Sequence, residues 1–213
     1  MKNFSIILVI SIIVVAIITG IYYLNRDTTN NSSYETSKLS NDNNLQDTNT
    51  TNTTEITIPV FTEQEICAFS TKVSGTAARK NNISICATTI NGATVEPGDT
   101  FSFWEVVGDT SAEKGYQKAK SFNEHGETIQ TYGGGVCQVS STIYNAVLLC
   151  PELETIERHP HSKKVTYVEE NKDAAVAHPS SDYKFKNNTG SKIRIDMNFD
   201  NDNLTVRIIK LAV

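Results

Sequence analysis

The stretch YGGGVCQVSSTIYNA, residues 132–146, joins a glycine triplet to an apolar pattern that continues to residue 150. Apolar side chains recur at intervals of three and four residues, which is typical of one face of a helix. This face consists of Val136, Val139, Ile143, Val147 and Cys150. Proline lacks a backbone N–H and clashes with the preceding turn, so Pro151 limits continuation. The sequence predicts a helix that begins just after Gly135.

The glycine triplet has two possible explanations. Gly133, Gly134 and Gly135 can adopt backbone conformations closed to other residues, at an entropic cost. Either a ligand approaches the backbone closely, or a tight turn packs against a neighbouring element. Free N–H groups at the start of a helix can hold a carboxylate. We therefore predict the three glycines, with the hydroxyls of Ser140 and Ser141, as candidate ligand-binding residues.

Cys137 is expected at the start of this helix, where the helix dipole favours an anion. The dipole contributes about 1 kcal/mol, which lowers a thiol pKa by about one unit and leaves mostly thiol at neutral pH. A nucleophilic cysteine would therefore need an imidazolium partner. His159 and His161 are candidates for this partner, and Asp173 or Asp182 could orient the imidazole.

Less reactive interpretations apply to the same residues. A cysteine among apolar neighbours is more often a buried small hydrophobe, and the two histidines could be structural. Zinc bound by Cys137, His159 and His161 is conceivable, but the C-x-x-C and H-E-x-x-H motifs are absent. The glycine run also lacks the Lys-Ser/Thr pair of a phosphate-binding loop. We expect neither a metal nor another cofactor.

The cysteine pairing is open at this point. A Cys67–Cys86 disulfide would close a loop of about 20 residues and add roughly 3 kcal/mol of stability. Four cysteines allow three pairings, and the sequence does not choose among them. A disulfide between Cys137 and Cys150 would exclude a nucleophilic role for Cys137.

Upstream of the predicted domain lies an apolar run, residues 4–24, within the segment 1–24. A transmembrane helix needs about 20 such residues, so the run predicts an uncleaved membrane anchor. A cleaved signal peptide is the alternative, but its apolar stretch is usually shorter and ends at a small-residue site, which residues 22–26 do not offer. The slight positive-inside bias favours a cytoplasmic N-terminus. We expect a single-pass cell-membrane protein with an extracytoplasmic C-terminal domain.

The remaining chain divides by composition. Residues 25–57 are mostly Asn, Thr, Ser and Asp, so they bury too little apolar surface to order, and we predict a disordered linker. Residues 58–213 are globular in pattern. The net charge of −5, without a Lys/Arg cluster, argues against nucleic acid as a partner.

The coarse element pattern predicts an α+β domain, a single globular unit with an antiparallel sheet and a few helices. Residues 66–70 are expected to form a strand and residues 81–90 a helix. After the cysteine helix the pattern is mostly β. The expected strands are residues 164–168, 183–186, 192–199 and 204–211, with the last three forming a meander.

The motif GGGVCQVS at 133–140, with YNA at 144–146, is similar to the signature of the VanW family. Further matches follow in order: FST at 69–71, PGDTFSF at 97–103, ERHPHS at 157–162 and residues 182–188. Trp104 departs from the family, whose members tend to carry Asn there. The resemblance implies a bacterial cell-envelope protein of a family associated with some glycopeptide-resistance gene clusters. It adds Gln138 and Arg158 to the candidate binding residues.

Three functions are compatible with these observations. The first is a binding or accessory module that acts on peptidoglycan or its precursors, with a cell-wall peptide as ligand and the membrane contacted through the anchor. The second is a thiol hydrolase or acyltransferase on wall peptides, with Cys137 as nucleophile and His159 or His161 as base. The third is a non-catalytic structural partner of envelope enzymes.

Overall fold

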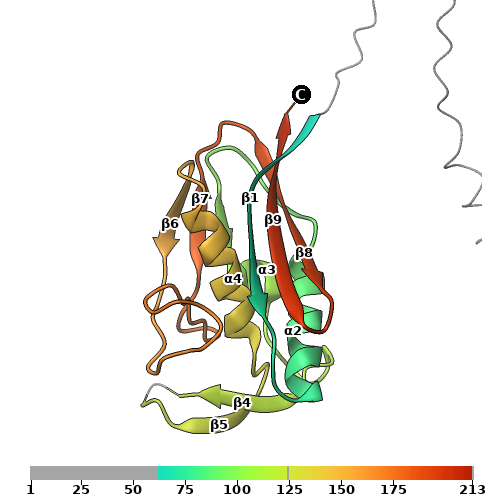
Figure 1. Ribbon diagram of the computed structural model, residues 1–213, viewed down its shortest axis with the longest axis vertical. Coiled ribbons are helices and arrows are strands. Elements are labelled where there is room, and N and C mark those ends of the chain that lie inside the picture. Colours follow the sequence, from blue (N-terminus) through green and yellow to red (C-terminus); the bar gives the residue numbers. More distant parts are fainter. Residues whose placement is uncertain (1–61, 124, 213) are drawn as a thin grey trace, which may run out of the picture. The chain divides into compact units, whose positions relative to one another are not determined.

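The computed structural model describes residues 62–123 and 125–212, all within one compact unit (Figure 1). This part of the chain is α+β, with three helices and antiparallel sheets, as predicted. The predicted anchor (1–24) and linker (25–57) lie outside the described residues. Within the described ranges, no helix combines the length and apolar character needed to cross a bilayer.

The largest sheet has the strand order β1-β9-β8-β2, and all neighbours are antiparallel. Its strands are β1 (Thr62–Lys72), β9 (Asn203–Ala212), β8 (Lys192–Phe199) and β2 (Ala93–Val95). In β8, Ile193, Ile195 and Met197 are buried while the alternate side chains are more exposed. This confirms the predicted alternation, since successive side chains of a strand point to opposite faces.

A second sheet, β3-β7-β6, lies on the other side of α4 from β1 and β9 (Figure 1). It contains β3 (Thr100–Ser102), β7 (Lys184–Asn187) and β6 (Leu153–Glu157). The predicted meander is therefore wrong in its first strand, because β7 pairs with β3 and β6 rather than with β8. Strands β4 (Lys118–Phe122) and β5 (Thr128–Tyr132) form a separate hairpin.

Buried Asn187 explains the change of sheet between β7 and β8. Its Nδ2 donates to the carbonyls of Val95, Glu96 and Ser191 at 3.0, 3.2 and 2.8 Å, and its Oδ1 accepts from Thr189. These bonds fix an irregular turn in place of a hairpin. The prediction of a strand at residues 164–168 is also wrong, because that segment is irregular.

Three helices complete the described part: α2 (Ala77–Ile90), α3 (Phe103–Val107) and α4 (Val136–Leu148). The predicted helix at 81–90 begins earlier, because the Thr76 side chain accepts from the N–H of Arg79 and caps it. Helix α4 begins after Gly135, as predicted. It lies between the two larger sheets and is buried on more than its apolar face, since Ser140, Ser141 and Thr142 have no exposed surface.

All four cysteines are free. Cys67, Cys86 and Cys150 are buried, whereas Cys137 is partly exposed. The Cys67 thiol interacts with Cys150, and burial followed by this neighbour raises the pKa of Cys67 to about 12. The structure thus contains neither a Cys67–Cys86 disulfide nor one that occupies Cys137.

Candidate active site

The glycine triplet packs closely against its neighbours, and Gly134 packs backbone against backbone. A Cβ added at Gly134 would lie 2.5 Å from the carbonyl oxygen of Ala119 in β4, and one at Gly133 would lie 2.6 Å from Thr110. Asn82 of α2 donates to the Gly134 carbonyl at 3.0 Å. Gly135 has a φ of +116°, which other residues rarely adopt. Of the two explanations, packing against β4 and α2 accounts for the triplet.

Cys137 is the second residue of α4, and it alone among the four cysteines is partly exposed. Its Sγ donates to the carbonyl of Val176 at 3.4 Å. The backbone N–H groups of Val136 and Gln138 donate to Gly133 and Gly135, both at 3.0 Å. The N–H of Cys137, by contrast, donates to no acceptor in the described part of the chain. The thiol is therefore beside an unused amide at a helix start.

His161 lies between Cys137 and Asp173. The Nδ1 of His161 is 2.6 Å from Oδ2 of Asp173, and the same oxygen accepts from the His161 backbone N–H at 2.6 Å. A carboxylate that accepts at Nδ1 fixes the tautomer with the proton on Nδ1, which leaves Nε2 as the acceptor. The imidazole also interacts with the thiol of Cys137. The structure thus brings together a thiol, an imidazole and a carboxylate in that order.

Two opposing effects set the pKa of His161. Burial lowers this pKa, but hydrogen bonding and charge interactions with Cys137, and then with Asp173, outweigh burial and raise it above its ordinary value. For Asp173, burial raises the pKa, yet hydrogen bonds from the His161 backbone and ring lower it overall. The carboxyl is thus held ionised and the imidazole gains basicity, as expected for neighbours of opposite charge.

Arg158 holds Asp173 from the other side. Its Nη2 donates to Oδ1 of Asp173 at 2.7 Å and to the carbonyl of Asn171 at 3.2 Å, and its Nε donates to the Asp173 carbonyl at 2.5 Å. The guanidinium also lies over the Tyr144 ring, 5.6 Å from the centroid. Among the predicted binding residues, Arg158 is therefore committed to positioning the carboxylate.

Ser140 and Ser141 are buried and join α4 to the segment that follows Asp173. Their hydroxyls donate to the carbonyl of Cys137 at 3.1 and 2.7 Å, and both also contact the carbonyl of Ala174. The Ser141 hydroxyl accepts from the N–H of Ala174 at 2.9 Å. These side chains are not available to a ligand. They fix the spacing between Cys137 and Asp173.

His159 and Asp182 are directed elsewhere. The Nε2 of His159 bonds to Oε1 of Glu157 at 2.9 Å, and its backbone pairs with Ala175. Asp182 accepts from the Ser102 hydroxyl at 2.6 Å and from the N–H of Trp104 at 3.2 Å, so it belongs to the start of α3. Of the alternatives predicted for base and orienter, the geometry joins His161 and Asp173 to Cys137.

Two residues that the sequence analysis missed also border the site. The hydroxyl of Tyr167 is 3.5 Å from Nε2 of His161, and its pKa is raised by burial and then by the neighbouring Cys137. Arg79, in the first turn of α2, interacts electrostatically with both Cys137 and Tyr167. Nothing in the sequence connects Arg79 to a cysteine far along the chain.

Gln138 is buried and binds Arg79. Its Nε2 donates to the Thr71 hydroxyl at 2.9 Å and to the Lys72 carbonyl at 3.0 Å. This leaves its Oε1 to accept from Nη2 of Arg79 at 2.7 Å. Gln138 therefore connects α4 to both β1 and α2 rather than pointing into solvent.

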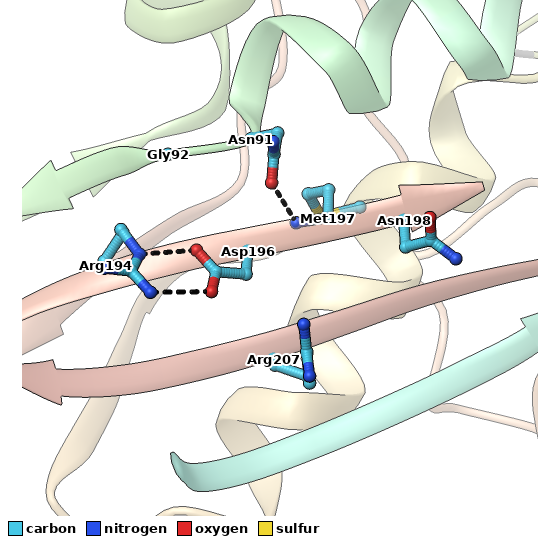
Figure 2. A pocket seen from close by; sticks show the side chains of 7 residues that line it. All are labelled: Asn91, Gly92, Arg194, Asp196, Met197, Asn198 and Arg207. Atoms are coloured by element: carbon cyan, nitrogen blue, oxygen red, sulfur yellow. Dashed lines mark hydrogen bonds and ion pairs between the residues drawn. The ribbon is translucent and has the colours of Figure 1, made fainter. Parts of the chain in front are cut away.

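Two surface hollows were found, one away from the site and one at its edge. The larger, of about 490 Å³, is shown in Figure 2 and lies along β8 and the end of α2, where Arg194 pairs with Asp196 and Asn91 accepts from Met197. The smaller, of about 180 Å³, borders His161 and Asp173. Within the described ranges, no group of three or more His, Cys, Asp and Glu side chains is arranged to hold a metal ion.

Comparison with known proteins places the chain in a family. The chain is 39% identical over 122 residues to "Uncharacterized protein YoaR" of Bacillus subtilis (strain 168), covering 57% of the chain and 40% of that relative. It is 30% identical over 129 residues to "Vancomycin B-type resistance protein VanW" of Enterococcus faecalis (strain ATCC 700802 / V583), covering 58% and 46%. It thus spans less than half the length of these relatives. No solved structure matches. Because residues 78–209 match the family described as VanW like protein, the chain belongs to that family.

Proposed function

We propose that this domain is a thiol-dependent acyl-transfer enzyme, a hydrolase or acyltransferase that acts on peptides of the bacterial cell wall. One observation carries the proposal: His161, whose Nδ1 is 2.6 Å from Oδ2 of Asp173, also interacts by hydrogen bonding and charge with the Cys137 thiol, and these interactions raise the pKa of its ring. A nucleophile, a base and a group that orients the base are the parts that such catalysis requires.

In the first step, Nε2 of His161 accepts the proton of the Cys137 thiol. The sulfur attacks the carbonyl carbon of a peptide bond, so that an S–C bond forms and the carbonyl oxygen becomes an oxyanion. Collapse of this intermediate breaks the C–N bond, and His161 returns its proton to the leaving amine. The acyl group then remains on Cys137 as a thioester.

In the second step, an acceptor releases the acyl group. Water as acceptor gives hydrolysis, and an amine gives acyl transfer. His161 removes a proton from the acceptor as the new C–O or C–N bond forms, the C–S bond breaks to release the sulfur as a thiolate, and His161 returns its proton to the sulfur. The unused N–H of Cys137 is suited to donate to the oxyanion in both steps.

The substrate class rests on the sequence and on the relatives. The apolar run at 4–24 is expected to anchor the chain with its domain outside the membrane, where wall peptides lie. One relative is named as a vancomycin resistance protein. These two observations favour peptidoglycan stem peptides over other acyl donors.

The test uses the purified full-length chain and stem peptides released from peptidoglycan, with products followed by mass spectrometry. We expect cleaved or transferred peptides with the wild type and none with Cys137→Ala. His161→Asn should reduce the rate by about 10²- to 10⁴-fold, because it removes the base.

The matched control is His159→Asn, which alters a histidine two residues away that contacts Glu157 instead of the thiol. Its rate should stay within about twofold of the wild type. A peptide that is retained by the wild type and by Cys137→Ala alike, without conversion, would instead favour a binding module. Equal losses in the two histidine variants would also contradict the proposed mechanism.

A further inference from the structure

Arg79 is held against the residues on either side of Cys137. Its Nη2 donates to Oε1 of Gln138 at 2.7 Å, and its Nη1 donates to the Ser74 carbonyl at 3.0 Å. A Cβ added at Gly135 would lie 2.9 Å from Cγ of Arg79, and one at Gly75 would lie 3.0 Å from Cδ. The absence of side chains at these two glycines makes room for the stem of Arg79, so the guanidinium is held against Gln138, the residue that follows Cys137.

Arg79 differs from the other arginines in residues 62–123 and 125–212 in the groups that surround its charge. Arg158, Arg194 and Arg207 each lie within 4.0 Å of a carboxylate. Within the same ranges, Arg79 has no such partner and donates to neutral oxygens alone. A partly buried charge without a counter-ion is unfavourable, and burial accordingly lowers the pKa of Arg79, opposed by Tyr167 and then Cys137.

The guanidinium has donors to spare. It carries five N–H groups in a planar fork that matches a carboxylate. Two hydrogen bonds, to Ser74 and Gln138, are all that the described residues provide. An incoming carboxylate would therefore find both charge and unused N–H groups without displacing either existing partner.

We propose that Arg79 forms an anion subsite beside Cys137, which binds a free carboxylate of the substrate close to the carbonyl that the thiol attacks. This inference rests on the proposed function and narrows its substrate class. The preferred acyl donor or acceptor is a peptide or amino acid with an ionised carboxylate next to the reacting group. A substrate in which that carboxylate is an amide would lose the contact.

The experiment compares two alkylating probes of similar size, iodoacetate and iodoacetamide. Both form a bond between Sγ of Cys137 and a CH₂ carbon with loss of iodide, but only iodoacetate carries a carboxylate. Rates at Cys137 are measured on the full-length chain near neutral pH by mass spectrometry of peptides. The ratio of the two rates reports the anion subsite, and the iodoacetamide rate alone reports the thiol.

We expect Arg79→Gln to lower the iodoacetate-to-iodoacetamide ratio by about tenfold, since a hydrogen bond to a charged group is lost. Arg79→Lys should lower it less, because the charge remains while the fork is lost. Lys80→Gln is the matched control: it removes the same charge from the next position of α2, where Lys80 pairs with Asp202 at 3.5 Å. Its ratio should stay at the wild-type value.

Each contrary outcome has a distinct meaning. Equal falls in both rates for Arg79→Gln would show that Arg79 acts on the thiol itself and would overturn the subsite. The same fall in ratio for Lys80→Gln would reduce the effect to general electrostatics and overturn it too. A wild-type Cys137 that reacts with neither probe would contradict the proposed function together with the subsite. If Arg79→Gln does not fold, Arg79→Lys provides the test. A ratio equal to that of the wild type in this variant would contradict binding of the carboxylate by the guanidinium.

Discussion

Asp173 accepts two hydrogen bonds from His161, one from the backbone N–H and one from Nδ1, and both are 2.6 Å long. A single carboxylate oxygen thus fixes the main chain and the ring of the same residue. Because the ring is fixed at Nδ1, its Nε2 is directed away from Asp173, toward the Tyr167 hydroxyl at 3.5 Å. This relationship leads to the first two predictions.

Asp173→Asn should reduce acyl transfer by about 10²- to 10⁴-fold. The amide no longer offers a charged acceptor to Nδ1, so the imidazole loses its fixed tautomer and its support as a cation. Rates on stem peptides measure the loss. Asp202→Asn, a change of the same kind at an exposed aspartate, serves as the control and should leave the rate unchanged. Equal activity in the two variants would remove Asp173 from the mechanism.

Cys137→Ala should lower the pKa of His161, because the largest effects that raise it come from the thiol. A folded-state pKa above the ordinary 6.5 contributes stability that is full below that value and is lost as pH rises through the folded pKa. The variant should therefore lose stability less steeply with rising pH in this range. Nuclear magnetic resonance titration of the ring measures the pKa. An unchanged pKa would mean that the thiol and the imidazole do not interact.

Gly134→Ala should lower the free energy of unfolding by about 2–3 kcal/mol, because its Cβ would meet the backbone of Ala119, which cannot rotate away. Gly190→Ala is the control, since nothing lies within 4 Å of an added Cβ there. That variant should lose only about 1 kcal/mol, the cost of a positive φ. Urea unfolding of both variants measures the difference, and equal losses would contradict backbone packing at Gly134.

Asn187→Ala should lower the free energy of unfolding by about 2–4 kcal/mol, because three carbonyls and the Thr189 N–H lose their partner in a buried place. Its neighbour Asn188 is exposed and bonds to Glu154 at 3.2 Å. Asn188→Ala should change stability by less than about 0.5 kcal/mol. A small effect in both would show that the turn between β7 and β8 does not depend on this amide.

The periodic spacing of apolar residues predicted those helices and strands whose buried face consists of a regular apolar pattern. Helix α4 and strand β8 are regular apolar patterns, and both lie where the pattern indicated. The pattern at residues 183–186 also predicted a strand, but a strand pattern carries no information on its partner. That choice depends on Asn187 and its contacts with residues near position 95, far away in the sequence.

The candidate site divides in the same way. The sequence predicted Cys137 from its place at the start of a helix, and it left His159 and His161 as alternative bases. Only the three-dimensional structure distinguishes the two histidines. Glu157, two residues before His159, bonds to that histidine, whereas Asp173, twelve residues after His161, bonds to the other. The sequence analysis missed Arg79 because only its tertiary contact with Gln138, the residue after Cys137, distinguishes it from other arginines.

The Ser141 hydroxyl donates to the Cys137 carbonyl and accepts from the N–H of Ala174, immediately after Asp173. Many enzymes divide their reactive groups between two lobes and can be switched off when the lobes part. Here one buried hydroxyl bonds both to the residue that carries the thiol and to the residue that follows the carboxylate, so a single side chain holds the two ends of the relay together. The reactive groups are therefore already assembled in the folded chain before any substrate binds.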